Sequence, residues 1–387
     1  MASKELVFPR GVGRGLSVRQ EVGKRERYTS PWSINCRTED FTRRLRGGSW
    51  VPSGPTSHSG VVRSGGYVVA NPGSSAPGSS GNADCIYRNR FIRPVGQAIY
   101  ASRMGDFTDW SMASEISDVA RPFVIQPSEA GEIGSNVVAL IPHKDAYLIV
   151  GTSSSLWVVR ADPVGGGSMQ NISREVGIVG PRAWCRDHLD RYYFLSSQGL
   201  CTISASGDGL QGLSDNVIPL ELAGVTDANT VLEYDHTTRS VAIHIPSANQ
   251  SWLFETEQQA FWPFKVGYEG SHIAIGPLQM ADGDSFGRLL RIHGITASGS
   301  AVVTWRVVVA SSAEQAANNA KLTIEALMSD PDHEPSYVHS KGSWAPGVNH
   351  RSYPRARGVY MVLVLSSLGL WGWEGAVCVT EQSGKWR

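Results

Sequence analysis

Histidine is the side chain that most often carries proton transfer or metal binding near neutral pH, so the ten histidines are the first candidates for chemistry. Two imidazoles reach one metal ion most simply when they stand at i, i+2 on a strand or at i, i+4 on a helix. No two histidines have either spacing: His58, His143, His188, His236, His244, His272, His293, His333, His339 and His350. The spacing therefore predicts no metal site, and we expect His244, inside an apolar run, to pack or to lie on the surface.

Other chemical motifs are incomplete. Asp282 and Asp284 in MADGDSFG (280–287) match the first half of a calcium loop, but the bidentate glutamate does not follow. The glycine-rich runs RGVGRG and PVGGG do not join a strand to a helix, as a phosphate-binding loop requires, and no G-x-S-x-G motif occurs. We therefore expect no enzyme activity, no catalytic residue and no cofactor. A carboxylate pair across a cleft leaves no sequence motif, so a propeller glycan hydrolase or lyase remains an alternative.

Tryptophan offers a second kind of chemistry, because exposed indole rings stack on sugars. Trp252, Trp262, Trp371 and Trp373 lie near the ends of strand-like runs. Trp371 and Trp373 alternate, so both rings would point to one face of a sheet. Large aromatic rings more commonly fill a β-rich core, which is the interpretation we favour. The alternative is a host-binding adhesin that uses exposed aromatics.

Basic residues gather at the N-terminus although the whole chain has a net charge of zero. Residues 1–50 contain eleven Lys/Arg against five Asp/Glu, a net charge of +6, which leaves about −6 on the rest. A basic segment on an acidic body is typical of an arm that reaches a neighbouring subunit or a polyanion. The candidate assembly or DNA-facing residues are Arg10, Arg14, Arg19, Lys24, Arg25, Arg27, Arg43, Arg44 and Arg46.

The elements that would position these residues are short strands rich in β-branched and aromatic residues, with Gly, Ser, Asn or Asp at their ends. They are expected at 66–71, 85–92, 97–103, 137–141, 147–151, 156–161, 191–197, 199–204, 229–235, 240–246, 251–256, 260–265, 288–294, 301–310, 358–366 and 375–382. Residues 191–204 read as a hairpin that turns at Ser197–Gly199, and 240–265 as a meander. Repeated antiparallel meanders predict a mainly β chain built as a β-propeller, with a pair of β-sandwiches as the rival architecture.

One segment breaks the strand pattern. Residues 311–330 open with Ser311 and Glu314, the spacing of a capping box, and predict a helix that ends before Pro331. The predicted organisation is therefore a basic arm with the first strand (1–50), a propeller body (51–310), a helical insertion and loop (311–345), and C-terminal closing strands (346–387). The stretch 71–82 reads as a mobile loop.

Cysteine usage and the termini constrain the cellular setting. The five cysteines are odd in number and form no C-x-x-C, and two lie in the apolar runs GAVCVT and GLCTIS, where a free thiol acts as a small hydrophobe. A reducing compartment of synthesis is the simplest expectation. The N-terminus has no apolar signal-like stretch, and no run of eighteen apolar residues predicts a membrane span.

Several segments from the first fifty residues to the last carry a recurring order of strands and Arg/Gly turns. They are TSPWSINCRTEDFTRRLRGGSW (29–50), YRNRFIRPVGQAIYASRMGDFTDW (87–110), DAYLIVGTSSSLWVVRADPVGGG (145–167) with its continuation to Trp184 and YFLSSQGL (193–200), and RARGVYMVLVLSSLGLWGWEGAVCVTEQSGKWR (355–387). This order resembles β-propeller virion proteins of tailed bacteriophages. The last segment is similar to the closing strands of podophage tail nozzle and tail-tube proteins.

The resemblance implies a structural virion protein, made in the host cytoplasm and placed in the tail or in the neck beneath the portal. It implies a ring of copies of the chain that lines or closes the DNA path during DNA ejection. Neighbouring portal, adaptor or tail proteins would be its partners, and double-stranded DNA in transit would meet it without sequence specificity. A closed ring needs a head-to-tail interface, and the basic arm is our candidate for supplying it.

Overall fold

The computed structural model describes residues 3–7, 32–34, 36–38, 45–47, 83–110, 117–125 and 135–385, except 208, 216, 219–220, 266–267, 269, 282–284, 298–299 and 331–333. Over these residues the protein is mainly β, as predicted, with antiparallel sheets and one α-helix. No helix in these ranges has the length and apolar composition to cross a membrane. The chain divides into two compact units, 52–249 and 1–51 together with 250–387. The strand expected at 66–71 and the loop at 71–82 lie outside the described residues.

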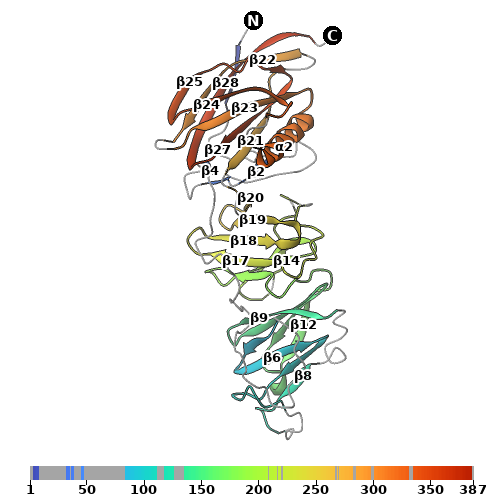
Figure 1. Cartoon of the computed structure of the whole chain (residues 1–387). Helices are drawn as coiled ribbons and strands as arrows, with labels where there is room; N and C mark the ends of the chain where they lie inside the picture. Colours follow the sequence, from blue (N-terminus) through green and yellow to red (C-terminus); the bar gives the residue numbers. More distant parts are fainter. Residues whose placement is uncertain are drawn as a thin grey trace. The chain divides into compact units, whose positions relative to one another are not determined.

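Four successive four-stranded antiparallel sheets, each with its strands in chain order, occupy the middle of the chain (Figure 1). The first is β5 Cys85–Tyr87, β6 Arg90–Val95, β7 Ala98–Ala101 and β8 Phe123–Ile125, and the second is β9 Val137–His143, β10 Tyr147–Thr152, β11 Leu156–Arg160 and β12 Ser168–Ser173. The third is β13 Trp184–Arg186, β14 Tyr192–Ser196, β15 Gly199–Ile203 and β16 Gln211–Gly212, and the fourth is β17 Val231–Asp235, β18 Ser240–Ile245, β19 Gln250–Glu255 and β20 Ala260–Phe264. The predicted hairpin at 191–204 and the meander at 240–265 are confirmed.

The turn between the first and second strands has the same backbone feature in all four sheets. Each contains a non-glycine residue with a positive φ, a conformation that tight antiparallel hairpins need because their twist must match that of the strands. The φ angles are 51° and 55° at Arg88 and Asn89, 49° at Lys144, 61° at Asp190 and 49° at Arg239. The repeat is therefore in backbone geometry, since the residue types at these positions differ.

Neighbouring sheets in unit 52–249 meet along their first strands. Strand β5 lies beside β9, and β13 lies beside β17. Buried side chains join the first two sheets into one apolar cluster, in which Cys85 and Ile92 of the first sheet pack with Leu148 and Trp157 of the second. The first strands are thus neighbours in two of the successive sheet pairs, the first with the second and the third with the fourth.

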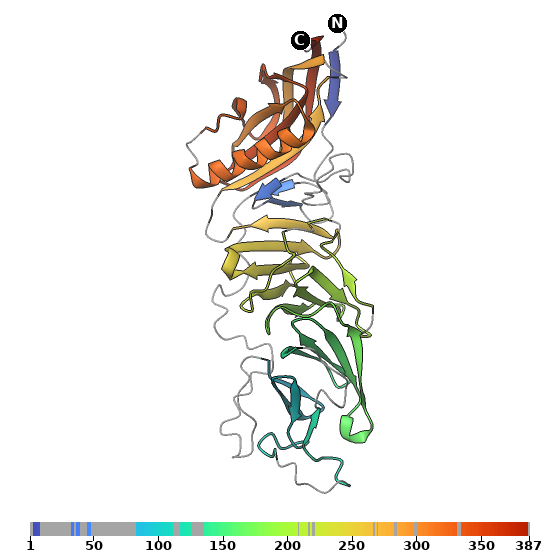
Figure 2. The ribbon, with the colours of Figure 1, turned by 90° about the vertical axis from the view of Figure 1, so that its right-hand side faces the viewer.

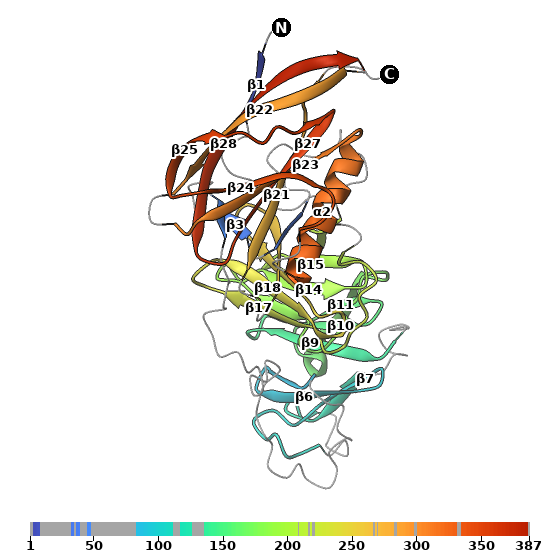
Figure 3. The same ribbon diagram turned by 45° about the horizontal axis from the view of Figure 1, so that its top comes forward.

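The unit formed by 1–51 and 250–387 holds two further sheets. The strands of these two sheets are β1 Ser3–Val7, β2 Trp32–Ile34, β3 Cys36–Thr38, β4 Leu45–Gly47, β21 Ser271–Gln279, β22 Ser285–Thr296, β23 Val303–Ala310, β24 Val338–Trp344, β25 Gly347–Ser352, β26 Arg357–Gly358, β27 Tyr360–Ser367 and β28 Trp371–Lys385. One sheet has the order β25-β22-β28-β4-β3, with β1 paired to β28 and β26 to β22, and the other has the order β2-β21-β27-β23-β24. Figure 3 shows β1 and β28 side by side near the two termini.

The predicted helix is present as α2, Ala313–Ser329, and it lies along the five-stranded sheet (Figure 2). Its buried residues Ala316, Ala320 and Ile324 pack on the apolar face of β23 and β27. The predicted capping residue is wrong by one position, because the Ser312 hydroxyl accepts the hydrogen bond from the Gln315 amide. Ser311 instead donates from its hydroxyl to the Gln315 side chain.

The segment expected to be an arm is partly built into the sheets. Its strand β1 pairs with β28, β2 pairs with β21, and β4 pairs with both β3 and β28. Strands β21 to β23 likewise pair with β27 and β28, so 271–310 and 346–387 share the same two sheets. The predicted division at residue 310 therefore does not coincide with a division of the structure.

Candidate functional site

The nine basic residues proposed from the sequence are largely beyond what the structure describes. Arg10, Arg14, Arg19, Lys24, Arg25, Arg27, Arg43 and Arg44 lie outside the described residues. Arg46 lies in β4, opposite Arg37 of β3 and Gly372 of β28. Two arginines are therefore at paired backbone positions in this corner of the seven-stranded sheet.

The four tryptophans considered for sugar stacking are core residues. Trp371 and Trp373 are fully buried, and Trp252 and Trp262 are 2% and 1% exposed. The Trp371 indole N–H donates to the Ser271 hydroxyl at 2.7 Å, so its polar edge is also engaged inside the protein. The favoured packing interpretation is confirmed, and the exposed Trp371–Trp373 platform that the adhesin alternative used is wrong.

A pocket of about 360 Å³ opens instead in unit 52–249, where the second, third and fourth sheets contribute residues. Its lining residues are Pro142, Trp184, Cys185, Arg186, Tyr192, Tyr234 and His236. Trp184, Cys185 and Arg186 come from β13, which is short and followed by the turn that carries Asp190. The side chains are thus held by strand ends and hairpin turns.

Two histidine–tyrosine pairs hold the aromatic walls of this pocket. Nδ1 of His143 lies 2.7 Å from the Tyr192 hydroxyl, and Nδ1 of His188 lies 2.7 Å from the Tyr234 hydroxyl. The His143 ring also stacks on Tyr147 at 4.6 Å between ring centroids. Burial lowers the pKa of His143 below its ordinary value, so this imidazole is neutral at pH 7. A neutral imidazole and a phenol form a hydrogen bond with no buried charge.

The polar tips of the wall residues already have partners within the protein. The Trp184 indole N–H donates to the Pro181 carbonyl at 3.1 Å, and both tyrosine hydroxyls contact histidines. What the walls offer to a ligand is therefore aromatic ring surface. A positive charge stands at the rim, where Arg186 lies 3.6 Å and Lys144 3.2 Å from the same carboxylate, that of Asp190.

Cys185 is almost fully buried, and its thiol is not displayed at the rim. Among the described residues no group of three or more His, Cys, Asp or Glu is placed to hold a metal ion. The pocket has the features of a small binding site: aromatic walls, a few polar groups and a cationic rim.

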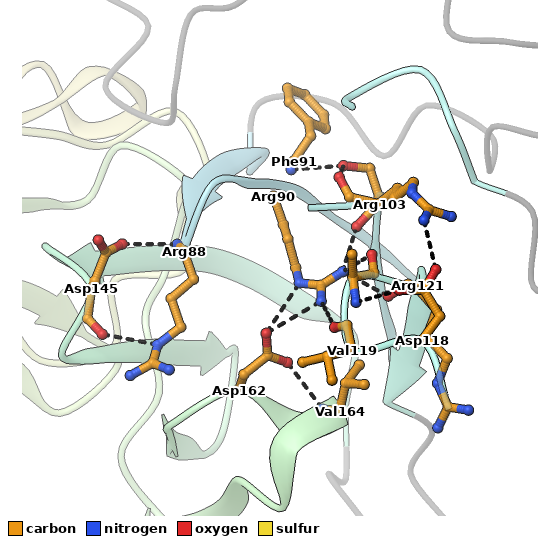
Figure 4. A network of polar contacts seen from close by, with 12 residues as sticks. Arg88, Arg90, Phe91, Arg103, Asp118, Val119, Arg121, Asp145, Asp162 and Val164 are labelled. Carbon is orange, nitrogen blue, oxygen red and sulfur yellow. Dashed lines mark hydrogen bonds and ion pairs between the residues drawn. The ribbon is translucent and has the colours of Figure 1, made fainter. Parts of the chain in front are cut away.

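A second polar network, centred on Arg90, ties the first sheet to the second (Figure 4). Arg90 is 1% exposed, and its Nε and Nη2 both donate to Asp162 at 3.3 Å. The remaining donors reach four backbone carbonyls, those of Ser102, Val119, Ala120 and Arg121, at 2.7–3.1 Å. Asp162 in turn accepts from the amide of Val164 in the turn after β11. One guanidinium therefore fixes the loop after β7 against the next sheet.

Polar contacts also join each first turn to the following sheet. Arg88 bonds to Asp145 through its backbone amide and its Nε, at 3.0 and 2.9 Å (Figure 4). Lys144 pairs with Asp190 between the second and third sheets, and the His188–Tyr234 pair follows between the third and fourth. Polar contacts from the first turns therefore join the first sheet to the second, the second to the third and the third to the fourth.

Sequence reasoning missed both the pocket and the Arg90 network. The one local signal was Arg90 itself, a charged residue at the start of the strand RFIRPV, which is buried at most positions. Its partner Asp162 is 72 residues away, so no local pattern pairs them.

No protein-family model and no curated protein matches this sequence. One solved structure with some similarity is a protein of unknown function from Bacteroides thetaiotaomicron, with a TM-score of 0.30, 10% identity, and coverage of 50% of this chain and 51% of the other. Another is the extracellular domain of a putative one-component system from the same organism, with a TM-score of 0.24, 10% identity, and coverage of 68% and 46%. This chain spans about half the length of these structures. Similarities this weak carry no argument about function.

Proposed function

We propose that this chain is a structural subunit of a tailed-bacteriophage virion, with a β-propeller-type body, in a ring of the tail or neck. The observation that carries the proposal is the run of four-stranded sheets in chain order, with first strands as neighbours in β5–β9 and β13–β17. Sequential antiparallel blades whose first strands face a common line are how propellers are built. The resemblance of residues 29–50, 87–110, 145–200 and 355–387 to phage propeller proteins supports the same assignment.

The polar contacts between successive sheets fit a protein that packs against neighbouring subunits. Arg88–Asp145, Lys144–Asp190 and His188–Tyr234 tie each sheet to the next through polar bonds in addition to the apolar cluster. Rigidly joined sheets present constant surfaces to neighbouring subunits, which a ring around a DNA path requires.

The basic segment is the proposed assembly element. Strands β1 and β2 attach its two ends to the sheets, and residues 8–31 between them carry six of the nine candidate basic residues: Arg10, Arg14, Arg19, Lys24, Arg25 and Arg27. With Glu21 and Glu26, the net charge of this stretch is +4. We infer that it lies against an acidic surface of the next copy in the ring, with DNA phosphates as the alternative.

Mass photometry of the purified chain tests this assembly role. Deleting residues 2–46 would also remove β1 to β3 and two of the three residues of β4. Neutralisation is therefore the cleaner change, with the six basic residues replaced by glutamine. We expect rings from the wild type and monomers from the variant, and the control Glu21→Gln/Glu26→Gln keeps the six cations and should assemble. Equal ring formation by the six-site variant would refute the arm, and a wild type that stays monomeric would refute the ring.

The pocket supports a second candidate, a host-binding adhesin that takes an anionic sugar. Its aromatic walls fit the apolar face of a sugar ring, and Arg186 at the rim fits a carboxylate. Glycan-array binding of the wild type, lost in Arg186→Ala and His236→Ala but kept in the distant control Arg174→Ala, would support it. Absence of binding to acidic glycans would remove this candidate. No specific feature of the described residues favours the hydrolase or lyase alternative, and we do not propose it.

A further inference from the structure

Two histidines from different strands meet on the seven-stranded sheet. His293 belongs to β22 and His350 to β25, the strand at the end of that sheet's order. The register pairs Ile292 with Ser352 and Gly294 with Asn349, so one residue of β22 faces two of β25. This is a β-bulge, which redirects side chains at a strand edge. Here it accompanies the approach of the two imidazoles.

The ring geometry is specific. The two Nδ1 atoms are 3.2 Å apart, the ring centroids are 5.4 Å apart, and the ring planes make an angle of 70°. A neutral imidazole carries its proton on only one nitrogen, so two Nδ1 lone pairs facing each other would repel. The pair is therefore stable in one of two ways, with a single proton between the nitrogens or with a cation that accepts both lone pairs.

The distance between the two Nδ1 atoms matches that expected for two nitrogens bound to one cation. Zinc–nitrogen bonds of about 2.0–2.1 Å place two ligand nitrogens about 2.9 Å apart at a 90° angle and about 3.4 Å apart at the tetrahedral angle. The observed 3.2 Å lies between these values. Both rings are also reachable from solvent, since His350 is exposed and His293 is partly exposed. An ion can enter without displacing the core.

We propose that His293 and His350 form a two-histidine chelate for a divalent transition-metal ion of the Zn²⁺, Ni²⁺ or Cu²⁺ class, with water in the remaining positions. Imidazole nitrogen suits these ions, whereas Ca²⁺ and Mg²⁺ prefer oxygen ligands. Among the described residues no group of three or more potential ligands is found, so these residues supply two bonds to the ion. A bound ion clamps β25 onto β22. This proposal does not depend on the proposed function.

Zinc titration by calorimetry tests the chelate, with the full chain as the sample. We expect one site per chain in the wild type and at least about tenfold weaker binding in His293→Ala and in His350→Ala, because each removes one of two bonds. The matched control is His339→Ala, which removes another exposed histidine, on β24, whose Nδ1 lies 3.1 Å from the backbone carbonyl of Tyr337.

Electron paramagnetic resonance with Cu²⁺ gives an independent readout of the number of bound nitrogens. The wild type and His339→Ala should show two equivalent imidazole nitrogens, and each chelate variant should show one. Circular dichroism verifies that the variants are folded, and folding is expected because both side chains reach solvent. Wild-type binding no tighter than that of the His350→Ala variant, or a single-nitrogen spectrum in the wild type, would overturn the proposal and leave a shared proton as the role of the pair.

Discussion

Replacing Arg90 by methionine tests how the first two sheets of unit 52–249 are held together. Methionine keeps most of the length of the apolar stem and removes the whole guanidinium. The carboxylate of Asp162 then loses two donors, and four backbone carbonyls of the loop after β7 lose theirs. Since Arg90 is 1% exposed, water cannot replace these bonds without opening the site.

The magnitude follows from the burial. Removing one partner of a buried, hydrogen-bonded ion pair lowers the free energy of unfolding by about 3–5 kcal/mol. For a unit of this size each kcal/mol shifts the melting temperature by about 2–4 °C, so the expected decrease is about 6–20 °C. The control Arg103→Met removes a pair with Asp118 whose side chains are 37% and 28% exposed. An exposed pair contributes at most about 1 kcal/mol, hence a shift of at most about 4 °C.

Urea unfolding measures the two free energies, and hydrogen exchange with mass spectrometry locates the change. Faster exchange is expected in peptides that cover residues 103–110 and 117–125 in Arg90→Met, and little change in Arg103→Met. Equal stability losses in the two variants, or a loss below about 1 kcal/mol for Arg90→Met, would show that the buried network does not hold the loop.

Three further predictions concern the other unit. Burial lowers the pKa of His272 from an ordinary 6.5 to about 4. As the pH falls from 6.5 to 4, the unfolded chain therefore binds a proton at this residue before the folded chain does. The free energy of unfolding decreases by about 3 kcal/mol over this range. Urea unfolding at pH 7 and pH 4 should show this loss in the wild type and not in His272→Gln; equal pH dependence would contradict it. Ser312→Ala should destabilise α2 by about 0.5–2 kcal/mol in thermal unfolding, and Ser311→Ala by less, with the reverse order contradicting the observed cap. Gly294→Ala should lower the free energy of unfolding by about 1–3 kcal/mol, because the added Cβ would come within 2.5 Å of the Trp344 ring, and an unchanged urea midpoint would contradict it.

Many of the strands were accessible from the sequence because they are short apolar runs that end in turn residues, and local chemistry decides both features. Trp252 and Trp262 could be assigned to the core for the same reason, since they stand inside such runs. The single strand expected at 85–92 was wrong, because a turn at Arg88 and Asn89 separates β5 from β6. The strands β12 and β24 were missed because their sequences, SMQNIS and VHSKGSW, are largely polar. The helix cap was missed by one residue because Ser311 and Ser312 both begin a capping-box spacing, with Glu314 and Gln315 respectively. Which hydroxyl caps the helix depends on the path by which β23 enters it.

The candidate sites were not accessible, because their residues are far apart in the chain. Arg90 and Asp162 are 72 residues apart, His143 and Tyr192 are 49 apart, and His293 meets His350 only through a bulge. The i, i+2 and i, i+4 spacings detect two histidines on the same strand or the same helix. They do not detect a pair such as His293 and His350, whose members lie on two different strands. The pairing of β22 with β28 was not accessible either, since it brings together segments that are distant in sequence.

The proposed virion role can be tested by immunogold labelling of this chain on phage particles purified from a lysate in which the protein is made. We expect label at the tail or neck of every particle, arranged about the tail axis. Particles that stay unlabelled while the protein remains in the soluble lysate would contradict it.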